Sequence, residues 1–502
     1  MQLIIKTFAQ LLATTYKKYI QSLQQPQKSQ DKIQNKLLKN LEKSNYSKSF
    51  NLTKPITWEE IPIVEYQDIE KFILDKSLTT EEIIFYEKTS GSRSAVKRIP
   101  YTKSLRHSFN QMFCIWAYDL ITYGPKLSTG KIYFCISPKF KEVESEKSGI
   151  AGNDSEYLDH WLRWILSPFL VSPPDIEKIK DPEEFKHQLA LTLIVEEKLE
   201  TISIWSPSFL KVILDYINTN SEILGSQLKN KISSQRYQIL TTKPIDYKKL
   251  WSSLKLISCW DRASAADGAD FLRSLFPRTL IQGKGLLATE APMTIPLINA
   301  KGCLPLLNEV FFEFQDESGK IYLIHEITQG EIYELIISQK GGLYRYRIGD
   351  RIRVTHFYFN TPCLEFIGRS KDISDLVGEK LNSNFVGDAV DSLGISNASY
   401  KSLISVNQGK PHYILLLDKT NQASAEIVEK LDHALKKSPQ YHRARLLGQL
   451  HPPRVLVSDQ ILEVITSFNA SHGKKWGDFK HEILPTKPIE EGLLTELEKI
   501  CN

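Results

Sequence analysis

The sequence predicts an α/β protein with a β-rich section in its middle, on the basis of three observations. Short runs rich in β-branched and aromatic residues, such as residues 131–137 and 254–260, alternate with longer runs of helical periodicity. Three further runs within residues 309–355 are separated by glycine-containing turns, which is typical of an antiparallel meander. A mixed α/β pattern then resumes over residues 375–502.

The chain is expected to form two domains with a boundary near residue 370, because 502 residues exceed one ordinary hydrophobic core. We expect a large N-terminal α/β domain over residues 1–370, with mixed sheets and a β-rich subdomain, and a smaller C-terminal α/β domain over residues 371–502. Residues 1–50 are expected to form an outer helical extension. Its apolar stripe follows a possible cap at Ser29 and recurs at helical spacing: Ile33, Leu37, Leu38 and Leu41.

Composition excludes several classes of function. The 64 basic and 59 acidic residues leave a formal charge of +5 that is spread along the chain, so nucleic acid is not an expected partner. The dispersed cysteines and histidines form no CxxC, HxH or HExxH pattern, so a dedicated metal site is not expected from them. No stretch approaches the roughly 18 uncharged apolar residues of a membrane span. We therefore expect a soluble, cytoplasmic monomer with reduced thiols.

A polar loop after the apolar residues 83–86 is the first candidate binding site. Its residues are Thr89, Ser90, Gly91 and Ser92. Small hydroxyl residues around a glycine let the backbone approach an anion, and their N–H and O–H groups can point at phosphate oxygens. Lys97 supplies the positive charge that a polyphosphate needs. The loop is not a Walker A motif, and an ordinary polar surface turn is the alternative.

A second candidate site lies at Thr289 and Glu290, after the glycine-rich residues 282–285. A carboxylate here can hold a Mg²⁺ ion bound to ATP, because hard cations prefer oxygen ligands. Thr289 can touch the α-phosphate. The alternative is a helix start, at which Thr289 or Glu290 only caps backbone N–H groups.

Asp350 and Arg369 form the third candidate site. Residues 341–350 follow a strand-like run and are expected to end in a turn, where Asp350 can accept hydrogen bonds from both ribose hydroxyls. Arg369 lies at the proposed domain boundary and can meet ribose or phosphate. The alternatives are a hairpin with cross-strand Arg and Tyr pairs around Asp350, and a solvated linker around Arg369.

The order and spacing of these clusters resemble those of the acyl-adenylate-forming superfamily. A Thr-Ser-Gly-Ser loop is followed by a Thr-Glu pair, a Tyr-Arg-x-Gly-Asp turn and a Gly-Arg-x-x-Asp sequence. Within that superfamily, the chain most resembles the auxin-responsive Gretchen Hagen family of acyl-acid amido synthetases, and in particular its bacterial members. The residues that carry this closer resemblance are 89–92 with 97–100, 282–290, 311–314, 333–335 and 342–350.

The resemblance implies the adenylate-forming enzyme fold and a role for each cluster. The loop at residues 89–92 would wrap the phosphates of ATP. Thr289 and Glu290 would lie at the α-phosphate and the Mg²⁺ ion. Asp350 would bind the ribose, with Arg369 beside it.

The resemblance also implies a mobile C-terminal domain with a hinge near residues 370–375. A lysine of that domain would contact the adenylate. Our choice for this lysine is Lys480, and a solvated surface lysine is the alternative.

The implied reaction uses ATP and Mg²⁺ to activate a small carboxylic acid as an acyl-adenylate, with release of pyrophosphate. Loop N–H groups, a lysine and Mg²⁺ would offset the negative charge that grows at phosphorus. The acyl group would then pass to an amine, such as an amino acid, to form an amide. Two alternatives stay open: a thioester ligase that ends on coenzyme A, and a nucleotide-binding protein without turnover.

Two positions depart from the pattern that the resemblance implies. Arg93 and Ser94 replace the Ser/Thr-Gly that usually continues the loop, which restricts the backbone and adds a bulky cation. Leu286 stands where the superfamily often has a tyrosine that stacks on adenine. The acyl pocket is expected from residues 112–116 and 205–208, with core packing as the alternative. Its candidate side chains are Met112, Phe113, Trp116 and Trp205.

Overall fold

A computed structural model describes residues 2–50, 55–88, 97–135, 167–174, 179, 181–369, 373–377, 379–446, 449–472 and 480–501. The chain divides into two units, each built from separate stretches. Unit 1 comprises Met1–Gly130, Ser145–Phe169 and Gly283–Ser370, and unit 2 comprises Lys131–Glu144, Leu170–Gln282 and Lys371–Asn502. The chain passes from unit 1 to unit 2 between Ser370 and Lys371, whereas the domains and the hinge expected there stay predictions.

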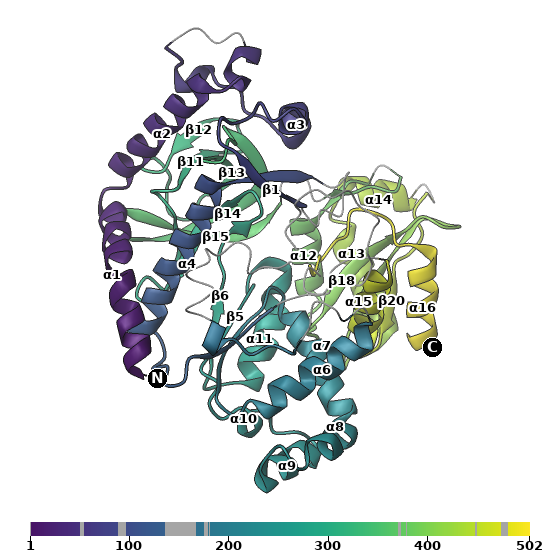
Figure 1. Cartoon of the computed structure of the whole chain (residues 1–502). Coiled ribbons are helices and arrows are strands. Elements are labelled where there is room, and N and C mark those ends of the chain that lie inside the picture. The colour runs from purple at the N-terminus through teal and green to yellow at the C-terminus, as the bar shows by residue number, and fades with distance from the viewer. Residues whose placement is uncertain are drawn as a thin grey trace. The chain divides into compact units, whose positions relative to one another are not determined.

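A five-stranded antiparallel sheet forms the largest sheet of unit 1 (Figure 1). Its strands are β11 (Val310–Gln315), β12 (Ile321–Leu323), β13 (Ile332–Gln339), β14 (Tyr346–Tyr358) and β15 (Thr361–Arg369). The three strands expected within residues 309–355 are confirmed as β11, β12 and β13, but β13 pairs with β11 and not with β12. The simple meander is therefore wrong in its order. The short, half-exposed β12 lies at the edge, while β11, which is buried from Val310 to Phe314, lies between β12 and β13.

Three short antiparallel hairpins also lie among the described residues of unit 1. They are β1 (Ile83–Lys88) with β2 (Arg98–Thr102), β7 (Leu287–Ala288) with β8 (Ala291–Pro292), and β9 (Thr294–Leu297) with β10 (Gly302–Pro305). The α-helices that the structure describes in this unit are α1 (Gln2–Gln24), α2 (Pro26–Lys43), α3 (Tyr66–Leu74) and α4 (Lys103–Tyr123). Figure 1 shows α1 lying alongside α4.

The expected helical extension consists of the two helices α1 and α2. Ile33, Leu37 and Leu41 are buried, so the apolar stripe is confirmed. The cap at Ser29 is wrong, because α2 already begins at Pro26. Proline suits the first helical position, since the N–H that it lacks would have no partner within the helix.

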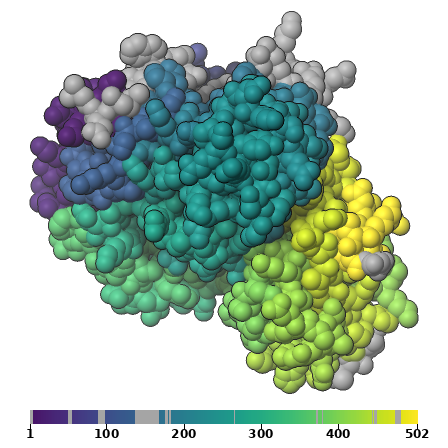
Figure 2. Space-filling model, turned by 90° about the horizontal axis from the view of Figure 1, so that it is seen from below, coloured from purple at the N-terminus to yellow at the C-terminus, as the bar shows by residue number. Residues whose placement is uncertain are grey.

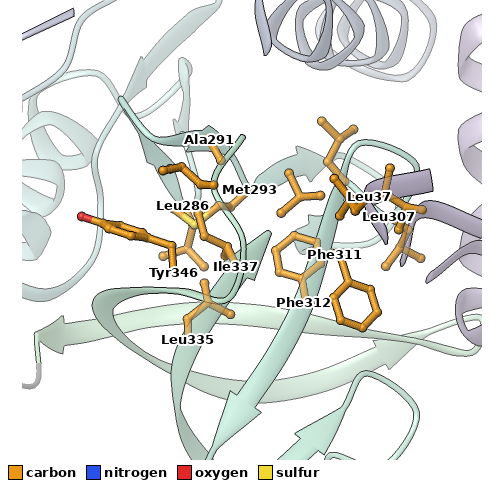
Figure 3. Close-up of a cluster of buried hydrophobic side chains, with 14 of the residues drawn as sticks. Leu37, Leu286, Ala291, Met293, Leu307, Phe311, Phe312, Leu335, Ile337 and Tyr346 are labelled. Carbon is orange, nitrogen blue, oxygen red and sulfur yellow. The ribbon is translucent and has the colours of Figure 1, made fainter. Parts of the chain in front are cut away.

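The hydrophobic core of unit 1 joins α2 to the five-stranded sheet and to the β7–β8 hairpin. Leu37 of α2, Phe312 of β11 and Ile337 of β13 are fully buried in it. Figure 3 shows these side chains with Leu286, Met293 and Tyr346 in one cluster. The core thus supports the hairpin that carries Thr289 and Glu290.

Unit 2 contains a four-stranded sheet whose order is β3-β4-β5-β6. The strands are β3 (Lys131–Phe134), β4 (Leu199–Ser203), β5 (Leu256–Cys259) and β6 (Leu280–Gly283). β3 pairs with β4, and β4 with β5, in the parallel direction expected of an α/β protein. The strands expected at residues 131–137 and 254–260 are confirmed as β3 and β5. The helices in this part are α6 (Pro182–Val195), α7 (Pro207–Thr219), α8 (Ser221–Leu228), α9 (Ser234–Thr241), α10 (Tyr247–Leu250) and α11 (Ala266–Leu275).

The C-terminal stretch of unit 2 has a three-stranded sheet of order β18-β19-β20 and a two-stranded one. The strands are β16 (Ile373–Ser374), β17 (Leu381–Asn382), β18 (Lys401–Val406), β19 (His412–Leu417) and β20 (Arg454–Val457). The helices are α12 (Ser383–Asp391), α13 (Ser424–Leu435), α14 (Pro439–Leu446), α15 (Ile461–Ser471) and α16 (Glu491–Cys501). The mixed α/β pattern expected over residues 375–502 is confirmed by these strands and helices.

One hydrophobic core of unit 2 is shared between two distant parts of the sequence. Ile404, Ile414 and Leu416 of the C-terminal sheet belong to the same buried cluster as Ile202 and Ile257 of β4 and β5. In Figure 2 the teal surface of the earlier stretch adjoins the green and yellow surface of the later one.

Within the described residues, no helix is long and apolar enough to cross a membrane.

Candidate active site

Strands β1 and β2 hold the two ends of the expected phosphate loop next to each other. Lys88 and Arg98 are paired directly in the antiparallel hairpin. The residues between them therefore join two adjacent strand ends. The loop residues Thr89, Ser90, Gly91 and Ser92, together with Arg93 and Ser94, lie outside the described residues.

Lys97 lies between two tyrosine side chains at the start of β2. Its Nζ donates a hydrogen bond to the hydroxyl of Tyr346 at 3.2 Å. The same Nζ is 5.6 Å from the ring centre of Tyr66 and 5.9 Å from that of Tyr346, within the range of cation–π attraction. The Tyr66 hydroxyl accepts a bond from the backbone N–H of Arg98 at 2.9 Å. The lysine is thus held at the loop end by aromatic neighbours.

Tyr346 links Lys97 to the other candidate residues. Its side chain is 1% exposed, and Figure 3 shows the hydroxyl at the margin of the core, pointing away from it. Burial raises the pKa of this phenol well above its ordinary value, the charge of Glu290 raises it further, and the charge of Arg369 lowers it. Glu290 and Arg369 therefore act electrostatically on the hydroxyl to which Lys97 donates its hydrogen bond. The phenol stays protonated at neutral pH and accepts the bond from Lys97.

Thr289 and Glu290 form the two-residue turn between β7 and β8. Leu287 pairs with Pro292 and Ala288 with Ala291, so the turn residues are fixed from both sides. The hydroxyl of Tyr101 donates to the carbonyl oxygen of Thr289 at 2.7 Å. The Glu290 side chain is 7% exposed. The alternative of a capped helix start is wrong, because a β-hairpin occupies this position.

Asp350 lies inside strand β14 and pairs directly with Arg369 at the end of β15. Arg369 Nε donates to Asp350 Oδ1 at 3.0 Å, and the Asp350 carboxylate is 8% exposed. The expected turn at Asp350 is wrong, and the hairpin alternative is right about the local structure. The β13–β14 register shifts next to this position, and Gly349 has a φ of +84°, which glycine adopts without strain.

A buried ion pair holds the chain just before Tyr346. Arg345 donates two hydrogen bonds to the Glu313 carboxylate of β11, from Nε at 3.0 Å and from Nη2 at 2.8 Å. Its Nη1 donates a third hydrogen bond to the carbonyl oxygen of Ile61 at 2.7 Å. Arg345 also has a φ of +46°, and its N–H bonds to Ser338 Oγ at 2.7 Å. This two-point contact fixes the start of β14, and with it the position of Tyr346.

The donor set around Glu290 fits a Mg²⁺ ion that arrives with a nucleotide. Mg²⁺ in nucleotide sites is bound through one or two carboxylates together with phosphate oxygens. The described residues contain no group of three or more His, Cys, Asp or Glu side chains that could hold a metal alone. A single buried carboxylate at Glu290 would therefore complete the coordination supplied by ATP.

Leu286, which stands where the superfamily often has a tyrosine, packs in the core of unit 1. It is 3% exposed and belongs to the cluster of Figure 3. Its backbone N–H donates to Thr294 Oγ1 at 2.7 Å. This departure from the pattern of the superfamily therefore coincides with a packing role for the side chain.

Lys480 belongs to unit 2, where its side chain is exposed and its Nζ lies 5.6 Å from the ring centre of Trp260. The ring centre of Trp260 in turn lies 5.8 Å from that of Trp205.

Glu379 follows the predicted hinge and is fully buried. Its carboxylate accepts hydrogen bonds from the N–H groups of Leu376 and Val377 at 2.8 Å each. That carboxylate therefore closes a structural turn.

The side chains suggested for an acyl pocket fall in different units. Met112, Phe113 and Trp116 are half-buried on α4 of unit 1, where Met112 and Trp116 pack against its core. Trp205 is half-buried in unit 2. Ser206 caps α7 by accepting a bond from Ser208 N–H, so these two serines have a structural role.

The structure adds Tyr66, Tyr101 and Tyr346 to the candidate site. No short motif marks Tyr66 or Tyr101, because each acts through a contact with a residue far away in the sequence. Tyr346 is part of the Tyr-Arg-x-Gly-Asp sequence. Its hydrogen bond with Lys97 depends on tertiary folding, which no sequence motif indicates.

Three models of one protein family match successive parts of the chain. The GH3 family N-terminal domain matches residues 15–281, the central domain residues 303–369, and the C-terminal domain residues 383–488. Curated relatives include the human "GH3 domain-containing protein", 27% identical over 41% of this chain and 44% of that protein. The "Indole-3-acetic acid-amido synthetase GH3.4" of Arabidopsis thaliana is 21% identical over 92% of this chain and 90% of that protein. The chain thus spans less than half the length of the first of these.

Solved structures share the fold over nearly the whole chain. The "AtGH3.15 acyl acid amido synthetase in complex with 2,4-DB" has a TM-score of 0.78 at 17% identity and covers 98% of this chain and 96% of its own. A 2-hydroxyisobutyryl-CoA ligase in the postadenylation state has a TM-score of 0.55 at 11% identity, covering 94% of this chain and 91% of its own. The expected adenylate-forming α/β fold is therefore confirmed.

Proposed function

Because this chain belongs to the GH3 family of acyl acid amido synthetases, we propose that it activates a small carboxylic acid with ATP and transfers the acyl group to an amino acid. The substrate carboxylate attacks the α-phosphorus, the bond to the bridging oxygen breaks, and pyrophosphate leaves. The amine then attacks the acyl carbon, and AMP leaves as the amide forms.

The network around Tyr346 is the observation that carries this proposal. A lysine at the loop end, a buried carboxylate in a hairpin turn and an Asp–Arg pair all act on or near one buried phenol in unit 1. A positive charge for the phosphates, one carboxylate for Mg²⁺ and one for the ribose are groups that a nucleoside triphosphate needs. The burial of Glu290 and Asp350 strengthens the electrostatic interactions that these two carboxylates make.

Each candidate residue has a proposed role in adenylation. Lys97 and the loop at residues 89–92 bind the phosphates, and Thr289 lies at the α-phosphate. Glu290 would hold Mg²⁺, and the ion would offset the negative charge that develops on the phosphate oxygens. Asp350 binds the ribose hydroxyls, and Arg369 orients Asp350 through the 3.0 Å bond.

The role of Lys480 rests on the sequence motif, and we propose it as the lysine that contacts the adenylate. The rotation of residues 371–502 about residues 370–375 between the two half-reactions is proposed on the same ground.

Acid-dependent pyrophosphate exchange into ATP tests the first half-reaction. We expect Glu290→Gln to lower exchange at least about tenfold, equivalent to about 1.4 kcal/mol of transition-state stabilisation, because the neutral amide binds Mg²⁺ poorly. Glu317→Gln is a matched control, since Glu317 is an exposed carboxylate in a surface ion pair with Arg351. A wild-type rate in a folded Glu290→Gln protein would refute the assignment.

The second half-reaction is tested by the choice of acyl acceptor. With a trapped acyl-adenylate, we expect amino acids to consume it and to yield an amide that mass spectrometry detects. Consumption by coenzyme A alone would show a thioester ligase. Binding of ATP without exchange for any acid of a broad panel would show a protein without turnover.

A further inference from the structure

Residues 480–484 run along the free edge of β18. This strand is at the edge of its sheet, because the strand order is β18-β19-β20. The N–H of Leu403 donates to the carbonyl of Ile483 at 2.7 Å, and Ser402 Oγ donates to the carbonyl of Glu482 at 2.8 Å. Leu484 is 1% exposed and packs in the core beneath the sheet. The segment is therefore attached at several consecutive residues.

His481 fixes the start of this segment. Its side chain is 8% exposed, and its Nε2 lies 2.6 Å from the carbonyl oxygen of Lys401. A carbonyl oxygen only accepts, so Nε2 carries the hydrogen. The imidazole ring also lies 4.5 Å from the ring of Tyr400, with the planes inclined by 30°. A hydrogen bond and a ring contact together set both the position and the rotation of the side chain.

We infer that His481 is a positioning residue for Lys480, an inference that rests on the proposed function. Lys480 is exposed, and its long stem has many rotamers, whereas the next residue is buried and held at two points. Fixing the backbone at residue 481 restricts where the Lys480 ammonium can reach. Geometric errors of about 1 Å in a reactive group are costly to catalysis, which gives such an anchor a function beyond stability.

A double-mutant cycle separates this role from a purely structural one. His481→Phe keeps the ring and removes the donor, and His481→Gln keeps an N–H donor at a similar reach. We expect His481→Phe to lower kcat for pyrophosphate exchange about tenfold and to leave KM for ATP within about twofold of the wild-type value. His481→Gln should recover most of the lost kcat. In a protein that already carries Lys480→Ala, the His481→Phe change should lower kcat for pyrophosphate exchange by less than about twofold. Equal losses in both backgrounds, or no loss in the first, would overturn the inference.

His472→Phe is the matched control. His472 also lies against an aromatic ring, 4.2 Å from Phe468, and its Nδ1 is 2.8 Å from a backbone carbonyl. We expect its exchange rate to stay within about twofold of the wild type. A loss as large as that of His481→Phe would overturn the inference.

Amide hydrogen exchange at Leu403 reports on the anchor without any substrate. We expect faster exchange of this N–H in His481→Phe than in the wild type, because its acceptor lies in the attached segment. Unchanged protection would overturn the anchoring itself. If the wild type catalyses no exchange with any acid, the proposed function fails and the positioning role fails with it. Loss of Leu403 protection in His481→Phe would still identify the contact as structural.

Discussion

Tyr346 joins the hydrophobic core to the candidate site within a single side chain. Its ring packs beside Leu286 and Ile337, while its hydroxyl accepts a bond from Lys97. Its place in the Tyr-Arg-x-Gly-Asp sequence could be recognised, but its partner could not. That partner is set by the register of β13 with β14 and by the β1–β2 hairpin, which no local pattern encodes.

Removing only the Tyr346 hydroxyl tests its link to the phosphate-binding lysine. We expect Tyr346→Phe to raise KM for ATP about fivefold, equivalent to about 1 kcal/mol, because Lys97 loses an acceptor that orients it. Steady-state exchange at varied ATP concentration measures this. Tyr344→Phe, in an equally buried tyrosine of the same core, should leave KM unchanged. An equal rise in both variants would contradict the specific role of Tyr346.

Asp432 gives a pH-dependent contribution to stability. Burial alone would raise its pKa, but bonds from Arg445, Lys436 and Tyr441 outweigh burial and hold it below its ordinary value. A lowered carboxyl pKa contributes stability above the unfolded pKa of about 4, and this contribution is lost as pH falls through the folded pKa.

We expect Asp432→Asn to lower the free energy of unfolding by about 1–3 kcal/mol at pH 7, and by progressively less as pH falls below about 4. Urea titrations at several pH values measure the difference. Glu426→Gln, in an exposed pair with Lys430 on the same helix, is the control and should change stability by less than about 0.5 kcal/mol. A difference for Asp432→Asn that grows toward acid pH would contradict the sign.

At the scale of elements, the positions of the strands along the sequence were easier to predict than the order of the strands in the sheet. β11 and β13 could be predicted from runs rich in apolar and aromatic residues, and the stripe of α2 from its helical spacing. The pairing of β13 with β11 could not, because it depends on which strand is buried on both faces. A helix start was the alternative interpretation at Thr289 and Glu290, because threonine and glutamate suit both a helix cap and a two-residue turn, and the structure has the turn.

The Arg345–Glu313 pair ties the start of β14 to β11, and its loss should loosen the sheet. We expect Glu313→Gln to lower the free energy of unfolding by about 3–5 kcal/mol, because it leaves a buried guanidinium without its counter-charge. The exposed pair of Arg351 with Glu317 is the control, and Glu317→Gln should cost less than about 1 kcal/mol. Denaturant unfolding measures both, and similar values for the two would refute the importance of burial.

At the scale of the whole molecule, the family and the fold could be predicted from ordered motifs, but the composition of unit 2 could not. The domain boundary near residue 370 stays a prediction, and residues 371–502 pack with residues 170–282 in one unit. Sequence patterns indicate local periodicity only. The contact between the segments that contain Ile202 and Ile414 therefore could not be predicted from the residues of either segment.

A truncated chain of residues 1–370 tests the importance of that shared core. We expect it to melt at a lower temperature than the full chain and to bind a hydrophobic dye, because the apolar partners of β4, β5 and α7 are removed. Thermal denaturation and dye fluorescence compare the two proteins. A fragment as stable as the full chain, without dye binding, would show that residues 371–502 form an independent domain.

The interleaving of the two units also sets an order of events at the ribosome. The last stretch of unit 1 ends at Ser370, so that unit can be complete while the final stretch is still being synthesised. The apolar side of residues 170–282 must wait for residues 371–502 before its core can close. During that interval the nascent chain displays uncovered apolar surface, which is the feature that chaperones bind.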